Sequence, residues 1–183
     1  KNMKDSFVKK HYFISILISL SCVIVINNFY RFFQNNASYE FDPWLSNYQG
    51  GFVRRGIPGE FFFQINDFLN IHPGWMVFIF VSLLYFFFYL IFFNLIKKIE
   101  LNKLLIFSLF SPLAFYFPIL NSRATGHKEI IFLFLLSLFC YFIPNLKRRH
   151  ANYLMIFIII FTGLSYEVLT LYTVYLVIPF VYI

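Results

Sequence analysis

Six long apolar runs, separated by polar segments, divide the sequence. An α-helix rises about 1.5 Å per residue, so roughly 20 apolar residues are needed to cross a hydrocarbon core about 30 Å thick. We therefore predict an all-α fold, a polytopic bundle of about six transmembrane helices in a single domain covering residues 1–183. The predicted spans are Tyr12–Phe29, Trp75–Leu95, Leu104–Leu120, Ile130–Ile143, Tyr153–Leu164 and Val168–Ile183.

The composition favours this fold class and excludes an ordinary soluble domain. Hydrophobic residues make up 60% of the chain and charged residues 13%, whereas soluble domains carry about 25% charged residues. The net charge of +7 lies in the flanks of the apolar runs, so we predict the lipid bilayer, and no nucleic acid, as its partner. Because the chain starts without Met and stops within an apolar run, we expect a longer natural protein.

The charges separate by membrane side once the N-terminus is placed in the cytoplasm. Ten of the fifteen basic residues then share the cytoplasmic face, namely Lys1, Lys4, Lys9, Lys10, Lys97, Lys98, Lys103, Lys147, Arg148 and Arg149. Asp5 and Glu100 are the only acidic residues on that face. The positive-inside rule supports this orientation. A functional site is expected to face outward, where the other acidic residues and the densest polar segments lie.

Two apolar runs are too short to cross a bilayer alone. Ile130–Ile143 covers about 21 Å, so it draws polar flanking residues toward the membrane. Glu167 separates the fifth run from the sixth. Either residues 163–167 form the turn of a helical hairpin, or one long helix buries Glu167 at a cost of roughly 2.5 to 3.5 kcal/mol. We favour the hairpin, with its turn near the outer surface.

The first external loop, residues 30–74, contains an amphipathic segment near residues 58–70. Its apolar residues share one helix face; they are Phe61, Phe62, Ile65, Phe68 and Leu69. Pro58 suits the first helical turn, where a missing N–H has no partner in any case. The segment is too short to span, so we expect a helix in the outer interface. Three aromatic residues are expected at the same depth as anchors: Trp44, Tyr48 and Trp75.

The segment Tyr39–Glu60 contains the first candidate site. Glycines there would let backbone N–H groups approach an anion, and paired arginines carry forked donors that match phosphate oxygens. These residues are Gly50, Gly51, Gly56, Arg54 and Arg55. The start of the following helix adds its positive end. The segment therefore predicts a diphosphate or lipid-phosphate site; the alternative is a Gly-rich turn whose arginines contact phospholipid headgroups.

Glu40 and Asp42 are the candidate catalytic residues. They stand two apart, so in an extended segment they lie on the same side, and Pro43 favours an extended Asp42. A carboxylate beside a phosphate site can act as a general base toward a hydroxyl nucleophile. The alternative is a solvated loop acid or a cap for the turn.

The segment Asn121–Glu129 contains the second candidate site. Glu129 can stabilise the positive end of the helix that follows, which is a structural role. Three cations oppose that dipole and need an anion nearby: Arg123, His127 and Lys128. A lipid phosphate would supply it; internal pairing is the alternative, with Glu40, Asp42 or Glu167.

Tyr166 and Glu167 form the third candidate site, because an ionisable residue near lipid depth indicates function. A plain surface turn is the alternative. The sequence contains no metal-binding or nucleotide-binding motif, and we predict no cofactor. The alternative is a divalent metal site formed by four residues, His127, Glu129, Asp42 and Glu167.

This arrangement resembles that of the C-type membrane glycosyltransferases, polytopic enzymes that take sugars from polyprenyl phosphates. In that family the first external loop carries an acidic residue and interfacial helices, and later external loops add polar residues. Here Glu40-Phe41-Asp42, the helix near 58–70, the loop 121–129 and Glu167 occupy the corresponding places. The stretch GGFVRRGIPGE also looks like segments of bacterial envelope-polysaccharide proteins.

The resemblance implies transfer of a sugar from a lipid-linked donor at the outer face of the bacterial inner membrane, in envelope polysaccharide or glycolipid assembly. Asp42 would be the base toward the acceptor hydroxyl. The donor phosphate would be neutralised by Arg54, Arg55, Arg123, His127 and Lys128. Two alternatives stay open: a polysaccharide polymerase or lipid-linked sugar transporter, and a non-enzymatic membrane subunit or sensor with internally paired charges.

Overall fold

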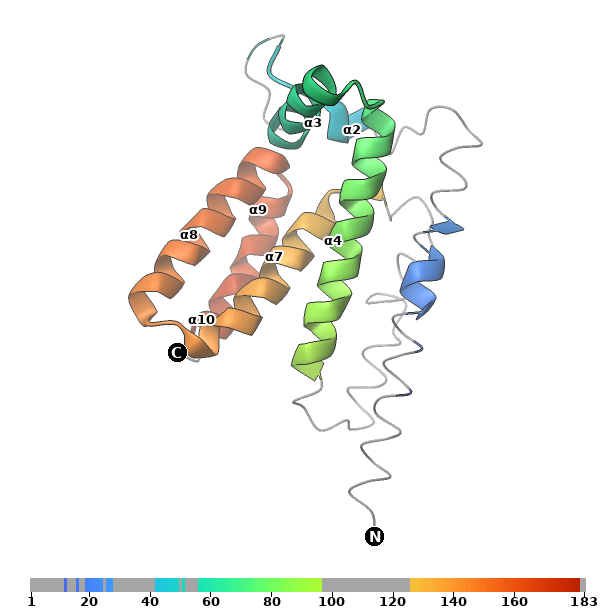
Figure 1. Cartoon of the computed structure of the whole chain (residues 1–183). Helices are drawn as coiled ribbons and strands as arrows, with labels where there is room; N and C mark the ends of the chain where they lie inside the picture. Colours follow the sequence, from blue (N-terminus) through green and yellow to red (C-terminus); the bar gives the residue numbers. More distant parts are fainter. Residues whose placement is uncertain are drawn as a thin grey trace.

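The computed structural model describes residues 12, 16, 19–24, 26–27, 42–49, 51, 56–96 and 126–181. Every regular element within these residues is an α-helix or a 3-10 helix, which confirms the all-α class (Figure 1). The elements are α2 (Asp42–Leu45), α3 (Gly56–Leu69), α4 (Pro73–Ile96), α7 (Glu129–Phe142), η2 (Ile143–Asn145), α8 (Arg148–Ser165), α9 (Leu169–Tyr172), η3 (Thr173–Leu176) and α10 (Val177–Val181). The predicted span Leu104–Leu120 lies outside the described residues, and Tyr12–Phe29 is described only in part.

The helix α4 has the length and composition of a membrane span. It contains 24 residues, its most apolar 18-residue window has a mean hydropathy of 2.6, and its length of about 36 Å exceeds a hydrocarbon core of about 30 Å. The predicted span Trp75–Leu95 lies within it. Among the described residues no other helix meets both criteria, so the structure gives one candidate span and does not confirm a bundle of six.

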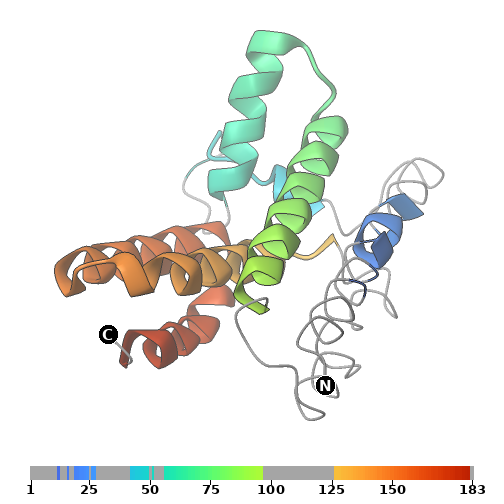
Figure 2. The same ribbon diagram turned by 60° about the horizontal axis from the view of Figure 1, so that its bottom comes forward.

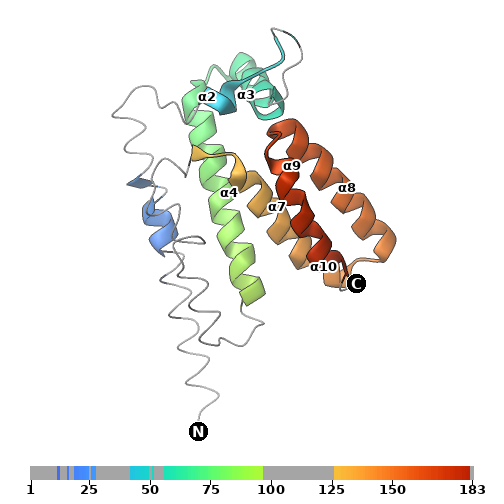
Figure 3. The same ribbon diagram turned by 180° about the vertical axis from the view of Figure 1, so that it is seen from behind.

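The last two apolar runs form a helical hairpin, as favoured from the sequence. The helix α8 ends at Ser165, and Tyr166 is extended, with φ −165° and ψ 118°. A new helix, α9, begins at Leu169, and Figure 3 shows α8 and α9–α10 side by side. Glu167 therefore lies in the turn rather than midway along one long helix. At its other end α8 begins at Arg148, earlier than the predicted Tyr153, because polar residues continue the helix beyond its apolar stretch.

The core lies where α4 packs against α7 and α7 packs against the hairpin. Its fully buried side chains include Val77 from α4, Phe139 from α7 and Ile158 from α8. Leu169 from α9 and Leu176 from η3 are also fully buried in this core. Tyr172 of α9 stacks on Phe132 of α7 with 5.9 Å between the ring centroids. The described bundle thus has one apolar interior and leaves the outward faces of its helices uncovered.

The helix α3 crosses the end of this bundle, transverse to α7 and α8 (Figure 2). Its bounds agree with the helix predicted near residues 58–70, and Pro58 lies in the first turn as expected. The single apolar face that we predicted for the interface is divided, however. Phe62 is buried against Phe80 of α4 at 5.4 Å, and Ile65 packs on the same core. The exposed apolar residues are Phe61, Phe68 and Leu69.

Two glycines allow α3 to approach the end of α2 closely. A side chain at Gly56 would meet the ring of Tyr48, and one at Gly59 would collide with the backbone carbonyl of Ser46. A ring can move aside, whereas the backbone of a packed segment moves only with the segment. Gly59 therefore fixes the distance between the first loop and α3.

We expect Gly59→Ala to destabilise the fold by about 1–3 kcal/mol, because the added methyl group overpacks a backbone contact. Gly163→Ala is the matched control, since its methyl group would meet only the side-chain methyl of Thr170, at 3.0 Å, and alanine favours the helix. Thermal unfolding of the purified protein in detergent measures both. Equal unfolding temperatures for the two variants would contradict the proposed close approach.

Candidate functional site

Three segments that are far apart in the sequence meet at one end of the bundle, the end that carries α2 and α3 (Figure 1). Trp44 in α2 donates from Nε1 to the carbonyl of Gly126, with a distance of 2.6 Å. Lys128 Nζ donates to the carbonyl of Ser165 at 3.1 Å and lies 5.8 Å from the centre of the Trp44 ring. We call these segments, residues 42–48, 126–129 and 165–167, the three-segment cluster. They belong to the three regions in which the sequence placed candidate sites.

Trp44 is the fully buried centre of the cluster. Its ring makes an edge contact with Phe80 of α4, with 6.0 Å between the centroids. A buried indole N–H needs an acceptor, and the Gly126 carbonyl provides one. The prediction that Trp44 is an anchor at the lipid interface is therefore wrong, because the protein itself encloses this side chain. Trp75, at the start of α4, is 40% exposed, and its role as an interfacial anchor stays a prediction.

Lys128 is the most unusual member of the cluster, since its residue surface is only 3% exposed. Lysine is almost never fully buried unless its charge has partners. Ser165 is the last residue of α8, where carbonyl groups lack helical partners and carry the negative end of the helix dipole. The ammonium satisfies that carbonyl and faces the electron-rich ring of Trp44. Lys128 thus joins the second loop to the hairpin and to the first loop.

His127 and Glu129 flank Lys128 in the sequence but differ from it, and from each other, in how far their side chains are exposed. Glu129 lies in the first turn of α7, as predicted, and its Oε2 atom is buried without a hydrogen-bond partner among the described residues. His127 Nδ1 lies 3.7 Å from this oxygen, and the His127 side chain is 53% exposed. A protonated imidazole would form an ion pair there. Within residues 126–129, His127 is therefore the basic side chain that solvent or a ligand can reach.

Glu60, which the sequence did not single out as a site residue, holds the first loop. Its Oε2 accepts the backbone N–H of Tyr48 at 3.1 Å, and its Oε1 accepts from Gln64 at 3.3 Å. The N–H of Gly51 in turn donates to the Tyr48 carbonyl, and the φ of +115° at Gly51 is one that favours glycine. Gly56 lies beneath the Tyr48 ring. Gly51 and Gly56 thus have structural roles in this loop, while anion binding by their N–H groups stays a prediction.

Several predicted site residues lie outside the described residues: Glu40, Gly50, Arg54, Arg55 and Arg123, together with the side chain of Asp42. The backbone of Asp42 begins α2. The extended conformation expected there is wrong, because Pro43 falls in the first turn of a helix, where no N–H donor is needed. Asp42 is thereby placed two residues before the buried Trp44.

Tyr166 and Glu167 lie in the hairpin turn beside Ser165 and are both partly exposed. The Glu167 carbonyl accepts the hydroxyl of Thr170 at 2.6 Å, which fixes the turn. Within the described ranges, no three side chains of His, Cys, Asp or Glu gather as metal ligands. The proposed set around His127, Glu129 and Glu167 is therefore not brought together by the residues that the structure describes.

Comparison with models of protein families, with curated proteins and with solved structures finds no match. The interpretation of the three-segment cluster thus rests on its own geometry and on the sequence.

Burial of Trp44 can be tested by fluorescence, because the chain has two tryptophans. Trp75→Phe leaves Trp44 as the single emitter, and we expect its emission to resist both acrylamide and brominated phospholipids. The parent protein should keep a quenched component from the exposed Trp75. Strong quenching of the variant by either agent would contradict the enclosed position of Trp44.

We expect Lys128→Met to lower the free energy of unfolding by about 1–3 kcal/mol, because a buried carbonyl loses its donor while the side-chain length is kept. The exposed neighbour provides the control: His127→Gln should change stability by less than about 0.5 kcal/mol. Thermal unfolding compares the two variants. If Lys128→Met were as stable as the control, Lys128 would have no structural role.

Proposed function

We propose that α4 spans a membrane and that the chain forms a bundle of about six spans. The support is the apolar outer surface of the described helices, on which large side chains from α4, α8 and the last helices are exposed. They include Ile79, Leu83, Phe86, Phe87, Ile156, Phe157, Ile160, Leu171, Val174, Ile178 and Val181. Soluble monomers rarely expose contiguous apolar surface on this scale. A hydrocarbon environment accounts for all of these faces together.

We further propose that the three-segment cluster faces the outside of a bacterial inner membrane. The opposite end of the bundle carries the turn between α7 and α8, where Lys147, Arg148 and Arg149 are exposed. Basic residues in short loops favour the cytoplasmic side. The cluster, with Glu60, Glu129 and Glu167, then lies at the other face.

We propose that the cluster binds the phosphate-bearing head of a lipid-linked sugar and that the protein transfers this sugar to an acceptor. The observation that carries the proposal is the meeting of the first loop, the second loop and the hairpin turn around Lys128 and Trp44. A lipid-linked donor has its chain in hydrocarbon and its phosphate at the surface. The apolar bundle would contact the lipid chain, and the polar segments at its end would contact the phosphate.

In this proposal some residues of the three segments hold the site together and others perform the chemistry. Trp44 and Lys128 hold α2 against the second loop, so that Asp42 is carried on a fixed turn and acts as the base toward the acceptor hydroxyl. His127, together with Arg54, Arg55 and Arg123, neutralises the donor phosphate. Preorganised cations at low dielectric stabilise developing charge. Lys128, being buried, contributes through position rather than through direct contact.

A second candidate function, a non-enzymatic membrane subunit, is favoured by a specific observation. Several described charged groups in the cluster and beside it contact the protein itself. Lys128 contacts Ser165, Glu60 holds Tyr48, and Glu129 lies beside His127. In that case the exposed parts of α3 and of the turns would form a binding surface for another membrane protein.

Binding separates the two functions. We expect the parent protein to retain a polyprenyl-phosphate or polyprenyl-diphosphate sugar in native mass spectrometry, and the double variant Arg54→Ala, Arg55→Ala to lose at least tenfold in retention, because two charge-assisted phosphate contacts disappear. Lys147→Ala, Arg149→Ala removes the same charge at the opposite end and serves as the control. Absence of such a lipid from the parent would favour the subunit.

A variant of Asp42 tests whether this residue acts as a catalytic base or contributes to lipid binding. Asp42→Asn should leave lipid retention unchanged and reduce sugar transfer by about 100-fold or more, since general base catalysis contributes 10²–10⁴-fold. Radiolabelled sugar transfer in reconstituted vesicles measures this. Near-parental transfer by Asp42→Asn would remove Asp42 from the mechanism, and tolerance there combined with loss in the arginine variant would indicate a transporter.

A further inference from the structure

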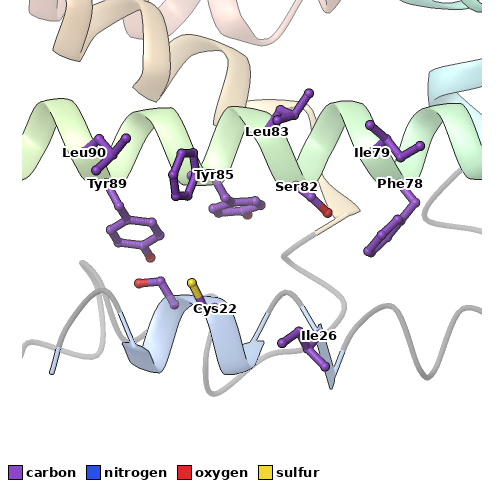
Figure 4. A pocket seen from close by; sticks show the side chains of 11 residues that line it. Cys22, Ile26, Phe78, Ile79, Ser82, Leu83, Tyr85, Tyr89 and Leu90 are labelled. Carbon is purple, nitrogen blue, oxygen red and sulfur yellow. The ribbon is translucent and has the colours of Figure 1, made fainter. Parts of the chain in front are cut away.

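A groove of about 380 Å³ runs along α4 on the side that faces the helical segment at residues 19–24 (Figure 4). On α4 its wall extends from Phe78 to Leu90, and Cys22 and Ile26 line the opposite side. The volume falls within the range of about 300–1,000 Å³ that is typical of ligand pockets. The groove is separate from the contacts that hold the three-segment cluster together.

The length of the groove matches the depth of one bilayer leaflet. From Phe78 to Leu90 the helix advances about 18 Å, and half of a hydrocarbon core about 30 Å thick is about 15 Å. The upper end of the groove begins just over one turn below Pro73, where α4 starts. An acyl chain from a lipid of the leaflet nearest the cluster would therefore run along the groove from its upper end. A polyprenyl chain, which is several times longer, would extend far beyond it.

The lining favours hydrocarbon over water. A trapped water needs two to four polar partners, and the groove is lined mainly by aromatic and aliphatic side chains. Ile79, Leu83 and Phe86 are at once part of the lining and part of the exposed apolar surface of α4. The groove thus opens sideways, toward the lipid that we place around α4.

We propose that this groove binds one acyl chain of a bilayer phospholipid. The proposal rests on the membrane placement of α4 and is independent of sugar transfer. A bound acyl chain would then lie along α4, the helix that packs on α7.

Photocrosslinking tests the proposal. The full chain is reconstituted in phosphatidylcholine vesicles that contain a small fraction of phosphatidylcholine with a diazirine midway along one acyl chain. After irradiation, mass spectrometry compares crosslinks at the groove residues with crosslinks at Ile156 and Ile160, which are exposed on α8. We expect several-fold more crosslinks in the groove, because a retained chain stays in place while bulk lipids exchange.

Filling the groove should remove this excess. Ser82→Phe places a ring where the chain would lie, and the crosslinks on α8 should stay unchanged; Ile160→Phe adds a ring outside the groove as the control. If Ser82→Phe is not monodisperse, Ile26→Trp fills the groove from the other wall. Equal crosslinking of the groove and of α8, or an excess that survives filling in a folded variant, would overturn the proposal. Lack of crosslinks at both places would instead overturn the membrane placement of α4, and the proposal with it.

Discussion

The described structure depends on one buried cation. Lys128 occupies an apolar interior in which an unpaired charge would be very costly, and it is accommodated by the end of α8 and the face of Trp44. Because Lys128 and these two partners come from three separate parts of the chain, the position of the ammonium fixes the first loop, the second loop and the hairpin relative to one another. The polar end of the bundle is thus organised by a charge that solvent scarcely reaches.

The same arrangement shows how a short helix can serve as a platform. On its own α2 has 4 residues, too few for a stable helix. It is held by the hydrogen bond from Trp44, by the edge contact with Phe80 and by the close approach of α3 at Gly59. Glu60 then fixes the backbone that follows at Tyr48. Each contact uses a different kind of interaction, so the loop is restrained in several directions.

Periodicity and length were sufficient to predict much of the fold from the sequence. The bounds of α3, α4 and α7 follow apolar patterns, and the break at Glu167 follows from the cost of burying a carboxylate. Partners across long sequence separations were not predictable. Trp44 was predicted as an interfacial anchor because aromatic residues beside polar loops of membrane proteins commonly lie at the lipid interface. The sequence around Trp44 does not reveal that its N–H donates to the carbonyl of Gly126. Lys128 looked like a phosphate ligand because two groups that contact it, the end of α8 and the Trp44 ring, lie far from it in the sequence.

The connection between Lys128 and Ser165 also bears on the order in which the chain is assembled. Synthesis completes Trp44 first, Lys128 later and Ser165 last, so the second loop emerges before its carbonyl partner exists. Until the hairpin has formed, the Lys128 ammonium lacks the Ser165 carbonyl, and the second loop lacks the contact that joins it to the hairpin. The end of the bundle that carries the three-segment cluster is therefore completed late in biogenesis, and a chain truncated before α8 would lack the carbonyl that fixes this lysine.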